Sequence, residues 1–155
     1  MKKLIEEIFE KLAARGATFA SAESCTGGLI ASTTTDIPGA SAFFRGGIVA
    51  YSAEVKISLL GVPAETILRH GVVSCECAEA MARGCAEKLG AQFAVATTGV
   101  AGPGAQDGVP AGTVCIALQT PQGTRAGKFF FPGEPRDRVK ILAVRAALQM
   151  LADGI

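Results

Sequence analysis

The residues of this chain that are best placed to do chemistry lie in residues 22–28, which read Ala-Glu-Ser-Cys-Thr-Gly-Gly. Ser24 and Cys25 place a hydroxyl and a thiol where an apolar segment gives way to a predicted helix. Side chains at such a junction point out of a sheet edge, and the free N–H groups of the helix attract an anion. Paired glycines let a ligand approach the backbone closely. The segment therefore predicts a ligand-binding or catalytic site.

Two side chains of this segment compete for the role of nucleophile. Ser24 has the placement of an attacking hydroxyl, although a serine at a helix start is also a common N-cap. Cys25 is the alternative, because a thiol at a helix N-terminus can have a lowered pKa. Packing of small residues in the interior explains Cys25 equally well. Both interpretations stay open on the residues alone.

A serine nucleophile also needs a base. The single histidine, His70, ends a predicted helix before Gly71, a position that suits the helix dipole, so a Ser-His-Asp triad has little support. A lysine can act as the base when burial or a neighbouring cation lowers its pKa. Lys56 is the candidate, because its helix begins just after the strand that ends at Tyr51. The alternative is a solvated surface lysine.

A second glycine-rich turn, residues 97–104, follows the apolar run 93–96. Thr98 and Gly99 can supply a hydroxyl and an N–H to the same centre as Ser24, the alternative being an ordinary turn. The turn does not match the G-x-G-x-x-G pattern of a dinucleotide site, and the chain has no P-loop. Two polar loops at one sheet edge are typical of ligand sites in open α/β sheets.

The elements that must position these residues alternate along the chain. Helices are predicted over residues 2–14, 26–34, 53–60, 63–71, 75–89 and 136–151, and strands over residues 18–20, 43–51, 93–97, 113–118 and 125–131. The last two strands form an antiparallel hairpin, and Gly46-Gly47 inside the second strand indicates a bulge or a nearby ligand. The pattern predicts one domain over residues 1–155, an α/β fold built as a three-layer α/β/α sandwich with a mixed, mostly parallel sheet.

Composition narrows the classes of partner and compartment. The net charge is +1 with scattered basic residues, which argues against nucleic acid and anionic membranes as partners. The N-terminal residues form an amphipathic helix rather than a signal peptide, and no apolar run approaches the ~18 residues of a membrane span. Five cysteines, an odd count, indicate reduced thiols in the cytoplasm. We expect no metal or other cofactor, and a homo-oligomer, a dimer or larger.

The chain resembles the CinA C-terminal domain family from about residue 5 to residue 153. The resemblance is carried by motifs that keep their order along the chain: residues 22–28, residues 44–52 with Lys56, residues 60–62, residues 71–74, residues 98–103 and residues 112–114. In that family the domain is an α/β/α sandwich whose enzymes hydrolyse the carboxamide of nicotinamide mononucleotide. The products are nicotinic acid mononucleotide and ammonia, in a step of pyridine nucleotide salvage.

The resemblance implies the same amidase activity for this chain. Ser24 matches the family's nucleophile, Tyr51 and Lys56 match the residues that activate it, and Thr98 matches a further hydroxyl of the site. A catalytically inactive nucleotide-binding module of the same fold is the alternative. A weaker one is an amidase for another pyridine or nucleoside amide.

The implied partner is a small-molecule nucleotide. We expect it to contact small residues of the turns and cations that hold its phosphate: Cys25, Thr26, Gly27, Gly28, Gly46, Gly47, Gly99 and Gly102, with Arg45, Arg136, Arg138 and Lys140. The chain departs from the family's usual pattern at Ala53, where Asn is common, at Val109, where Lys is common, and at Lys140, where Arg is common. These departures concern phosphate affinity more than the catalytic hydroxyls.

Overall fold

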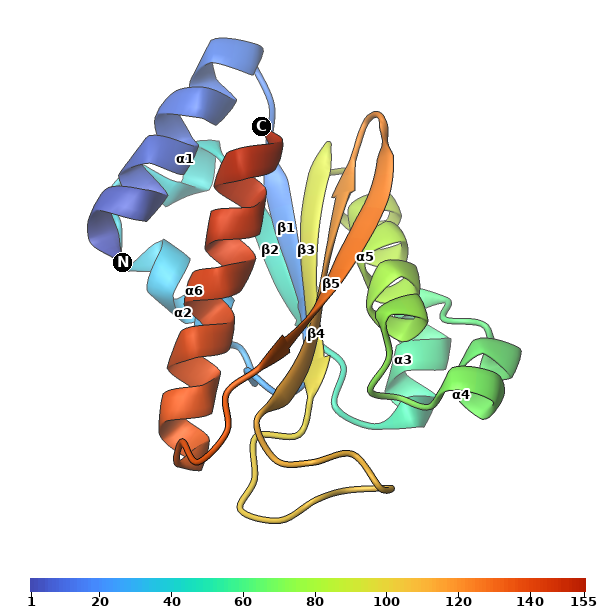
Figure 1. Ribbon diagram of the computed structural model, residues 1–155. Coiled ribbons are helices and arrows are strands. Elements are labelled where there is room, and N and C mark those ends of the chain that lie inside the picture. Colours follow the sequence, from blue (N-terminus) through green and yellow to red (C-terminus); the bar gives the residue numbers. More distant parts are fainter.

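The computed structural model describes all residues from 1 to 155 as one mixed sheet between two helical layers (Figure 1). The helices are α1 (Lys2–Arg15), α2 (Leu29–Thr35), α3 (Ala53–Leu60), α4 (Ala64–His70), α5 (Cys75–Leu89) and α6 (Arg136–Gly154), with a 3-10 turn at Ala40–Ala42. The strands are β1 (Phe19–Glu23), β2 (Phe44–Val49), β3 (Phe93–Gly99), β4 (Thr113–Thr120) and β5 (Gly123–Phe130). The predicted three-layer sandwich is confirmed.

The strand order of the sheet is β2-β1-β3-β4-β5. β1 pairs in parallel with β2 and β3, whereas β4 is antiparallel to both β3 and β5. The sheet is therefore mixed as predicted, with β4 alone running against the others and the predicted β4–β5 hairpin in place. The carboxyl ends of β1, β2 and β3 meet at one edge, where ligands bind in open α/β sheets.

The two faces of the sheet carry side chains of different size. Phe19, Phe93 and Val95 point with the larger β4 residues toward α1, α2 and α6. The alternate residues of the same strands, such as Ala94 and Ala96, point toward α3 and α5. Because a strand turns successive side chains to opposite faces, this alternation lets α5 pack closely on a surface of alanine and cysteine.

Two predicted element boundaries near the site are wrong. β1 continues to Glu23 instead of ending at residue 20, because Ser21 and Glu23 are polar yet fully buried and hydrogen-bonded to each other. α2 begins at Leu29 instead of near residue 26, because Gly27 and Gly28 have φ angles of +63° and +92°. Left-handed residues cannot belong to a right-handed helix. The helices α1 to α6 are each too short or too polar to cross a lipid bilayer.

Candidate active site

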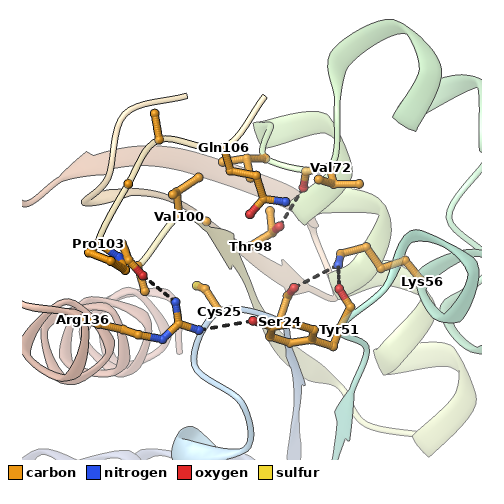
Figure 2. A pocket seen from close by; sticks show the side chains of 16 residues that line it. Ser24, Cys25, Tyr51, Lys56, Val72, Thr98, Val100, Pro103, Gln106 and Arg136 are labelled. Carbon is orange, nitrogen blue, oxygen red and sulfur yellow. Dashed lines mark hydrogen bonds between the residues drawn. The ribbon is translucent and has the colours of Figure 1, made fainter. Parts of the chain in front are cut away.

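A cavity of about 320 Å³ opens at the carboxyl ends of β1, β2 and β3. This volume lies at the lower end of the ~300–1,000 Å³ typical of small-molecule sites. The loops after these strands supply most of its lining, and α3 and α6 add one cationic side chain each (Figure 2). The predicted site residues that line this cavity are Ser24, Cys25, Tyr51, Lys56, Thr98, Gly99, Gly102 and Arg136.

Ser24 lies on a tight turn and not at the start of a helix. Its N–H donates to the Thr97 carbonyl at 3.0 Å, which continues the parallel ladder one residue past β1. The N-cap of α2 is Gly28, so the N-cap interpretation of Ser24 is wrong. The Ser24 hydroxyl is instead turned toward Lys56.

Glu23 anchors this turn from beneath. Its fully buried carboxylate accepts hydrogen bonds from the Ile30 and Ala31 N–H groups at 2.9 Å and from the Thr26 hydroxyl at 2.8 Å. The Thr26 hydroxyl also lies 2.8 Å from that of Thr97. The N-terminus of α2 thus attracts an anion as predicted, but the anion is the protein's own carboxylate and not a ligand.

Lys56 reaches Ser24 from α3 on the other side of the turn. Its Nζ lies 2.9 Å from Ser24 Oγ and 3.0 Å from the main-chain oxygens of both Ala50 and Tyr51. The residue is 1% exposed, so the surface-lysine alternative is wrong. In its neutral form the amine has two N–H bonds and one lone pair, so the two carbonyls can accept its hydrogens while the lone pair faces the Ser24 hydroxyl.

Burial lowers the pKa of Lys56 from its ordinary value of 10.5, and nearby Cys77 and Cys25 act weakly in the opposite direction. None of the ion pairs in the structure includes Lys56. A buried amine without a carboxylate partner favours its neutral form, which is the form that can accept a proton.

Cys25 lies in the same cavity but is 6% exposed. Burial, reinforced by the negative charge of Glu23, raises its pKa to about 11 against the opposing effects of a Thr97 hydrogen bond and Lys56. The thiol is therefore neutral near pH 7 and a poor nucleophile. This favours Ser24 over Cys25 as the attacking group.

Thr98, Arg136 and Tyr51 are tied to the cavity walls by hydrogen bonds. The Thr98 hydroxyl donates to the Val72 carbonyl at 2.6 Å and so fixes the loop between α4 and α5. Arg136 donates to the Gly102 carbonyl at 2.7 Å and to the Tyr51 hydroxyl at 3.2 Å. Arg136 is the one arginine that lines the cavity (Figure 2). The Tyr51 hydroxyl makes no hydrogen bond with Ser24.

The structure does not bring Arg45, Gly46 and Gly47 to this cavity. Gly46 pairs with Ala20, which places Arg45 and Gly46 four residues or more below Ser24, roughly 13 Å along the strand. Arg45 sits at a register shift, the bulge predicted from the glycines, and its Nε donates to the Leu89 carbonyl. A Cβ on Gly47 would lie 2.8 Å from the Ser21 Oγ of the neighbouring strand, so this position has no room for a side chain. Gly47 therefore has a role in packing and not in ligand binding.

Five other predicted binding residues lie outside the cavity lining. The Thr26 side chain is fully buried on Glu23, and Gly27 and Gly28 shape the turn by their left-handed backbone. Lys140 Nζ lies beside Gly27, 3.7 Å from where a Cβ would be, and Lys140 is not part of the cavity lining. Arg138 is exposed on α6 and lines no part of the cavity.

Two contributors to the site were not predicted from the sequence. Glu23 is one, and the signal was an acidic side chain within reach of the first N–H groups of α2. Gln106 is the other, and lines the cavity from the loop between β3 and β4 (Figure 2). Its main chain exchanges two hydrogen bonds with that of Val109, and the two residues between them, Asp107 and Gly108, both have positive φ angles. This is a two-residue hairpin turn, which the Asp-Gly pair in the sequence could have indicated.

No three His, Cys, Asp or Glu side chains come together in a way that could hold a metal ion. His70 lies outside the cavity, with its Nδ1 3.5 Å from Glu76. The arrangement that remains is a hydroxyl next to a buried amine, beside one arginine and two glycine-rich turns. Such a pair can carry out covalent transfer of an acyl group.

Known proteins match the chain along its whole length. A family model described as the CinA C-terminal domain matches residues 1–155. A CinA-like protein of Frankia casuarinae is 50% identical over 140 residues, which is 90% of this chain and 32% of that protein. A CinA-like protein of Fervidobacterium nodosum is 43% identical over 155 residues, 99% of this chain and 38% of that protein. The chain thus spans roughly a third of the length of these curated relatives.

Solved structures agree with the fold. A competence-damaged protein (CinA) superfamily protein from Escherichia coli has a TM-score of 0.95 at 33% identity, over 99% of this chain and 90% of that one. The competence damage-inducible protein A (ComA) from Klebsiella pneumoniae has a TM-score of 0.93 at 38% identity, over 98% and 94%. The fold and motifs therefore define an α/β protein of one family. The chain belongs to the CinA C-terminal domain family.

Proposed function

We propose that this chain hydrolyses the carboxamide of nicotinamide mononucleotide to nicotinic acid mononucleotide and ammonia, a step of pyridine nucleotide salvage. The observation that carries the proposal is the 2.9 Å contact between Ser24 Oγ and Lys56 Nζ at the floor of the cavity. A serine beside a neutral lysine is an activated nucleophile, and an amide is a substrate that requires one.

The first half of the reaction forms an acyl-enzyme. The Lys56 amine takes the Ser24 proton as Ser24 Oγ bonds to the carboxamide carbon, and the carbonyl oxygen becomes an oxyanion. The N–H group of Cys25, a residue of the cavity lining, donates to no protein acceptor and is our candidate for holding that oxyanion. The C–N bond then breaks while Lys56 returns the proton to the nitrogen, and ammonia leaves.

The second half restores the enzyme. Lys56 takes a proton from water, the hydroxide oxygen attacks the ester carbon, and the C–O bond to Ser24 breaks as Ser24 regains its proton. A single oxyanion donor supplies about 2.7–4 kcal/mol, while enzymes lower barriers by roughly 8–23 kcal/mol. Covalent catalysis with a base is therefore needed in addition to oxyanion binding.

The proposed binding residues are those that the cavity brings together. Arg136 is the proposed partner of the phosphate, because it is the fixed cation of the lining and an arginine binds phosphate through two parallel hydrogen bonds. The backbones of Cys25, Gly99 and Gly102 and the hydroxyl of Thr98 complete the lining around the ligand. Thr26, Gly27 and Gly28 contribute by shaping the turn that carries Ser24.

The test is ammonia release from purified protein given nicotinamide mononucleotide, nicotinamide riboside or nicotinamide. Each charge-assisted hydrogen bond to phosphate is worth roughly 1.5–3 kcal/mol, so two should raise kcat/KM for the nucleotide at least about a hundredfold over the riboside. Comparable kcat/KM values for the three compounds would show that the enzyme does not recognise the phosphate. Binding of the nucleotide without ammonia release would favour the alternative of an inactive nucleotide-binding module.

A further inference from the structure

Tyr51 is the one aromatic residue that lines the cavity, and the only tyrosine of the chain. It is 64% exposed, while its neighbours Ser24 and Lys56 are buried. An exposed ring between buried catalytic groups is an unusual use of a large aromatic side chain, since such rings usually find cover. Its ring is therefore available to a ligand that enters the cavity.

Both ends of Tyr51 are held in place. Its carbonyl accepts a hydrogen bond from Lys56 Nζ at 3.0 Å, and its hydroxyl accepts one from Arg136 at 3.2 Å. Figure 2 shows the ring beside Ser24, between the Arg136 guanidinium and the Lys56 amine. Lys56 contacts the Ser24 hydroxyl and the Tyr51 carbonyl, and Arg136 donates to the Tyr51 hydroxyl. The part of Tyr51 that has no partner is therefore the face of its ring.

The cavity lining contains no Asp or Glu. A cationic group bound there finds no carboxylate, and the aromatic face is the surface that attracts it, through the negative potential above the ring. The ring of nicotinamide mononucleotide is a pyridinium, which carries a positive charge. The charge and the aromatic face are thus complementary.

We propose that the face of Tyr51 is the platform on which the pyridinium ring of the substrate stacks, and that the site selects its substrate by ring charge. This inference rests on the proposed function for the identity of the ligand. A ring on this platform lies next to Ser24, where its carboxamide must be placed for attack. Tyr51 then determines specificity instead of acting as a base.

The test compares two ligands that differ in ring charge, nicotinamide mononucleotide and its 1,4-dihydro form, which has a neutral ring and the same ribose, phosphate and carboxamide. Titration calorimetry with Ser24→Ala protein measures binding without turnover. Cation–π attraction corresponds to roughly a twofold to thirtyfold preference for the cationic ligand. Tyr51→Leu in the same background should bring the ratio of the two affinities to about one.

Tyr51→Phe separates the ring from its hydroxyl. This variant keeps the aromatic face, so the ratio should stay within about threefold of that of the tyrosine protein, even if both ligands bind less tightly once Arg136 loses its phenol partner. A ratio near one with Tyr51 present, a ratio unchanged in Tyr51→Leu, or no binding of either ligand at millimolar concentration would each overturn the platform.

The ammonia assay keeps the two proposals apart. Charge-dependent binding without ammonia release by the unmodified protein would support the platform and overturn the amidase. Ammonia release together with a ratio insensitive to Tyr51→Leu would overturn the platform and leave the amidase standing.

Discussion

At the scale of single residues, the account depends on what burial does to one amine. Lys56 has three polar partners within 3.0 Å and no carboxylate among them. Desolvation is therefore the largest effect on its charge, outweighs the opposing effect of Cys77 and Cys25, and lowers its pKa. The same burial raises the pKa of the Cys25 thiol, so one environment favours the amine as a base and disfavours the thiol as a nucleophile.

Replacing Lys56 tests its role as the base. Lys56→Met should lower kcat by about 10²–10⁴, the range typical for loss of a general base. Lys56→Arg should not restore activity, because a guanidinium stays protonated in proteins. Steady-state ammonia release measures both variants. A fully active arginine variant would make Lys56 a fixed charge and return the role of base to Tyr51.

The pH dependence of kcat should follow the ionisation of Lys56. The amine must be neutral to accept a proton, so activity is lost as pH falls through the Lys56 pKa and is retained above it. Burial lowers that pKa, so the midpoint should lie below the ordinary 10.5. Burial also raises the pKa values of the nearby Cys25 and Cys77 thiols above their ordinary 9.0. A kcat–pH profile with no acid limb would contradict this assignment.

At the scale of elements, the site depends on how closely α3 lies against α5. A Cβ on Gly84 of α5 would be 1.8 Å from the Leu60 carbonyl oxygen at the end of α3. No side chain fits into that space, so the two helices touch through their backbones there. Because Lys56 is one turn before Leu60 on α3, the contact also sets how far Lys56 reaches toward Ser24.

Gly84→Ala should therefore affect stability and catalysis together. We expect a loss of about 1–3 kcal/mol in the free energy of unfolding, as for other overpacked contacts. We also expect kcat to fall by up to about a hundredfold, because a displacement near 1 Å at a catalytic group has that effect. Arg83→Ala, its exposed neighbour on α5, is the control and should stay within about 0.5 kcal/mol. Unchanged melting and unchanged kcat in Gly84→Ala would refute the close contact.

Sequence reasoning predicted the elements well where local signals were strong. α3 and α5 begin and end at the predicted residues, because the Ser52 and Ser74 side chains cap their first turns and glycines follow their last ones. The start of α2 was wrong, since helical spacing does not reveal that Gly27 and Gly28 take left-handed conformations. The spacing of apolar residues carries no information about these backbone conformations.

The site was predicted in part for the same reason. Ser24 follows β1 and Thr98 lies near the end of the neighbouring parallel strand β3, so their proximity could be predicted from strand order alone. Arg45 was misplaced, because it lies at a bulge near the start of β2, with a partner on α5, and therefore at the end of the strand away from the cavity. The burial of Lys56 depends on the α3–α5 contact, which no short motif in the sequence encodes.

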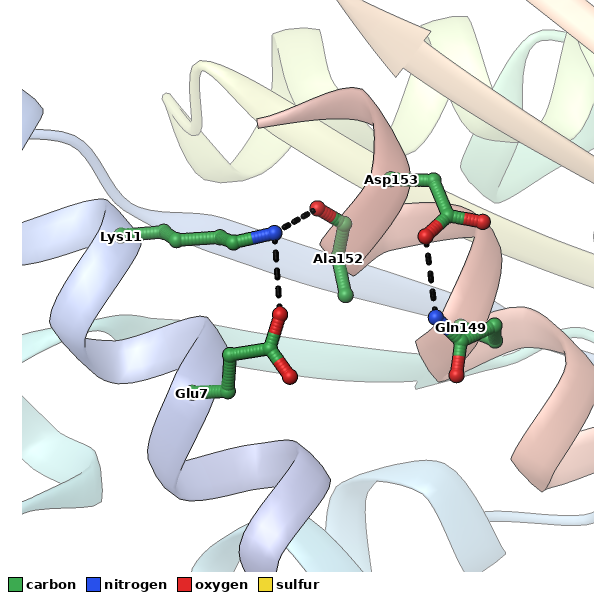
Figure 3. A network of polar contacts seen from close by, with 5 residues as sticks. All are labelled: Glu7, Lys11, Gln149, Ala152 and Asp153. Carbon is green, nitrogen blue, oxygen red and sulfur yellow. Dashed lines mark hydrogen bonds and ion pairs between the residues drawn. The ribbon is translucent and has the colours of Figure 1, made fainter.

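At the scale of the whole molecule, the first and last helices are tied together far from the cavity. Lys11 of α1 donates to the Ala152 carbonyl of α6 at 2.7 Å and pairs with Glu7 at 3.0 Å (Figure 3). On the exposed side of α6, Gln149 donates to Asp153 at 2.9 Å (Figure 3). The lysine satisfies one of the carbonyls that the end of a helix leaves free.

Lys11→Met should lower stability without changing catalysis. We expect a loss of about 1 kcal/mol, which corresponds to a fall in Tm of roughly 2–4 °C for a chain of this size. The value of kcat should not change, because Lys11 lies outside the cavity. Lys2→Met is the matched control, since Lys2 has only an exposed 3.8 Å contact with Glu6 and should shift Tm little. Equal Tm values for the two variants would show that the Ala152 contact adds nothing.

The central claim, that Ser24 attacks an amide, is tested most directly by the rate of ammonia release from nicotinamide mononucleotide in Ser24→Ala beside the unmodified protein. We predict a fall in kcat of at least about a thousandfold with binding of the nucleotide retained, because a nucleophile contributes to chemistry more than to ground-state affinity. Cys25→Ser in the same assay should cost far less. Turnover by Ser24→Ala within about tenfold of the unmodified protein would contradict the account.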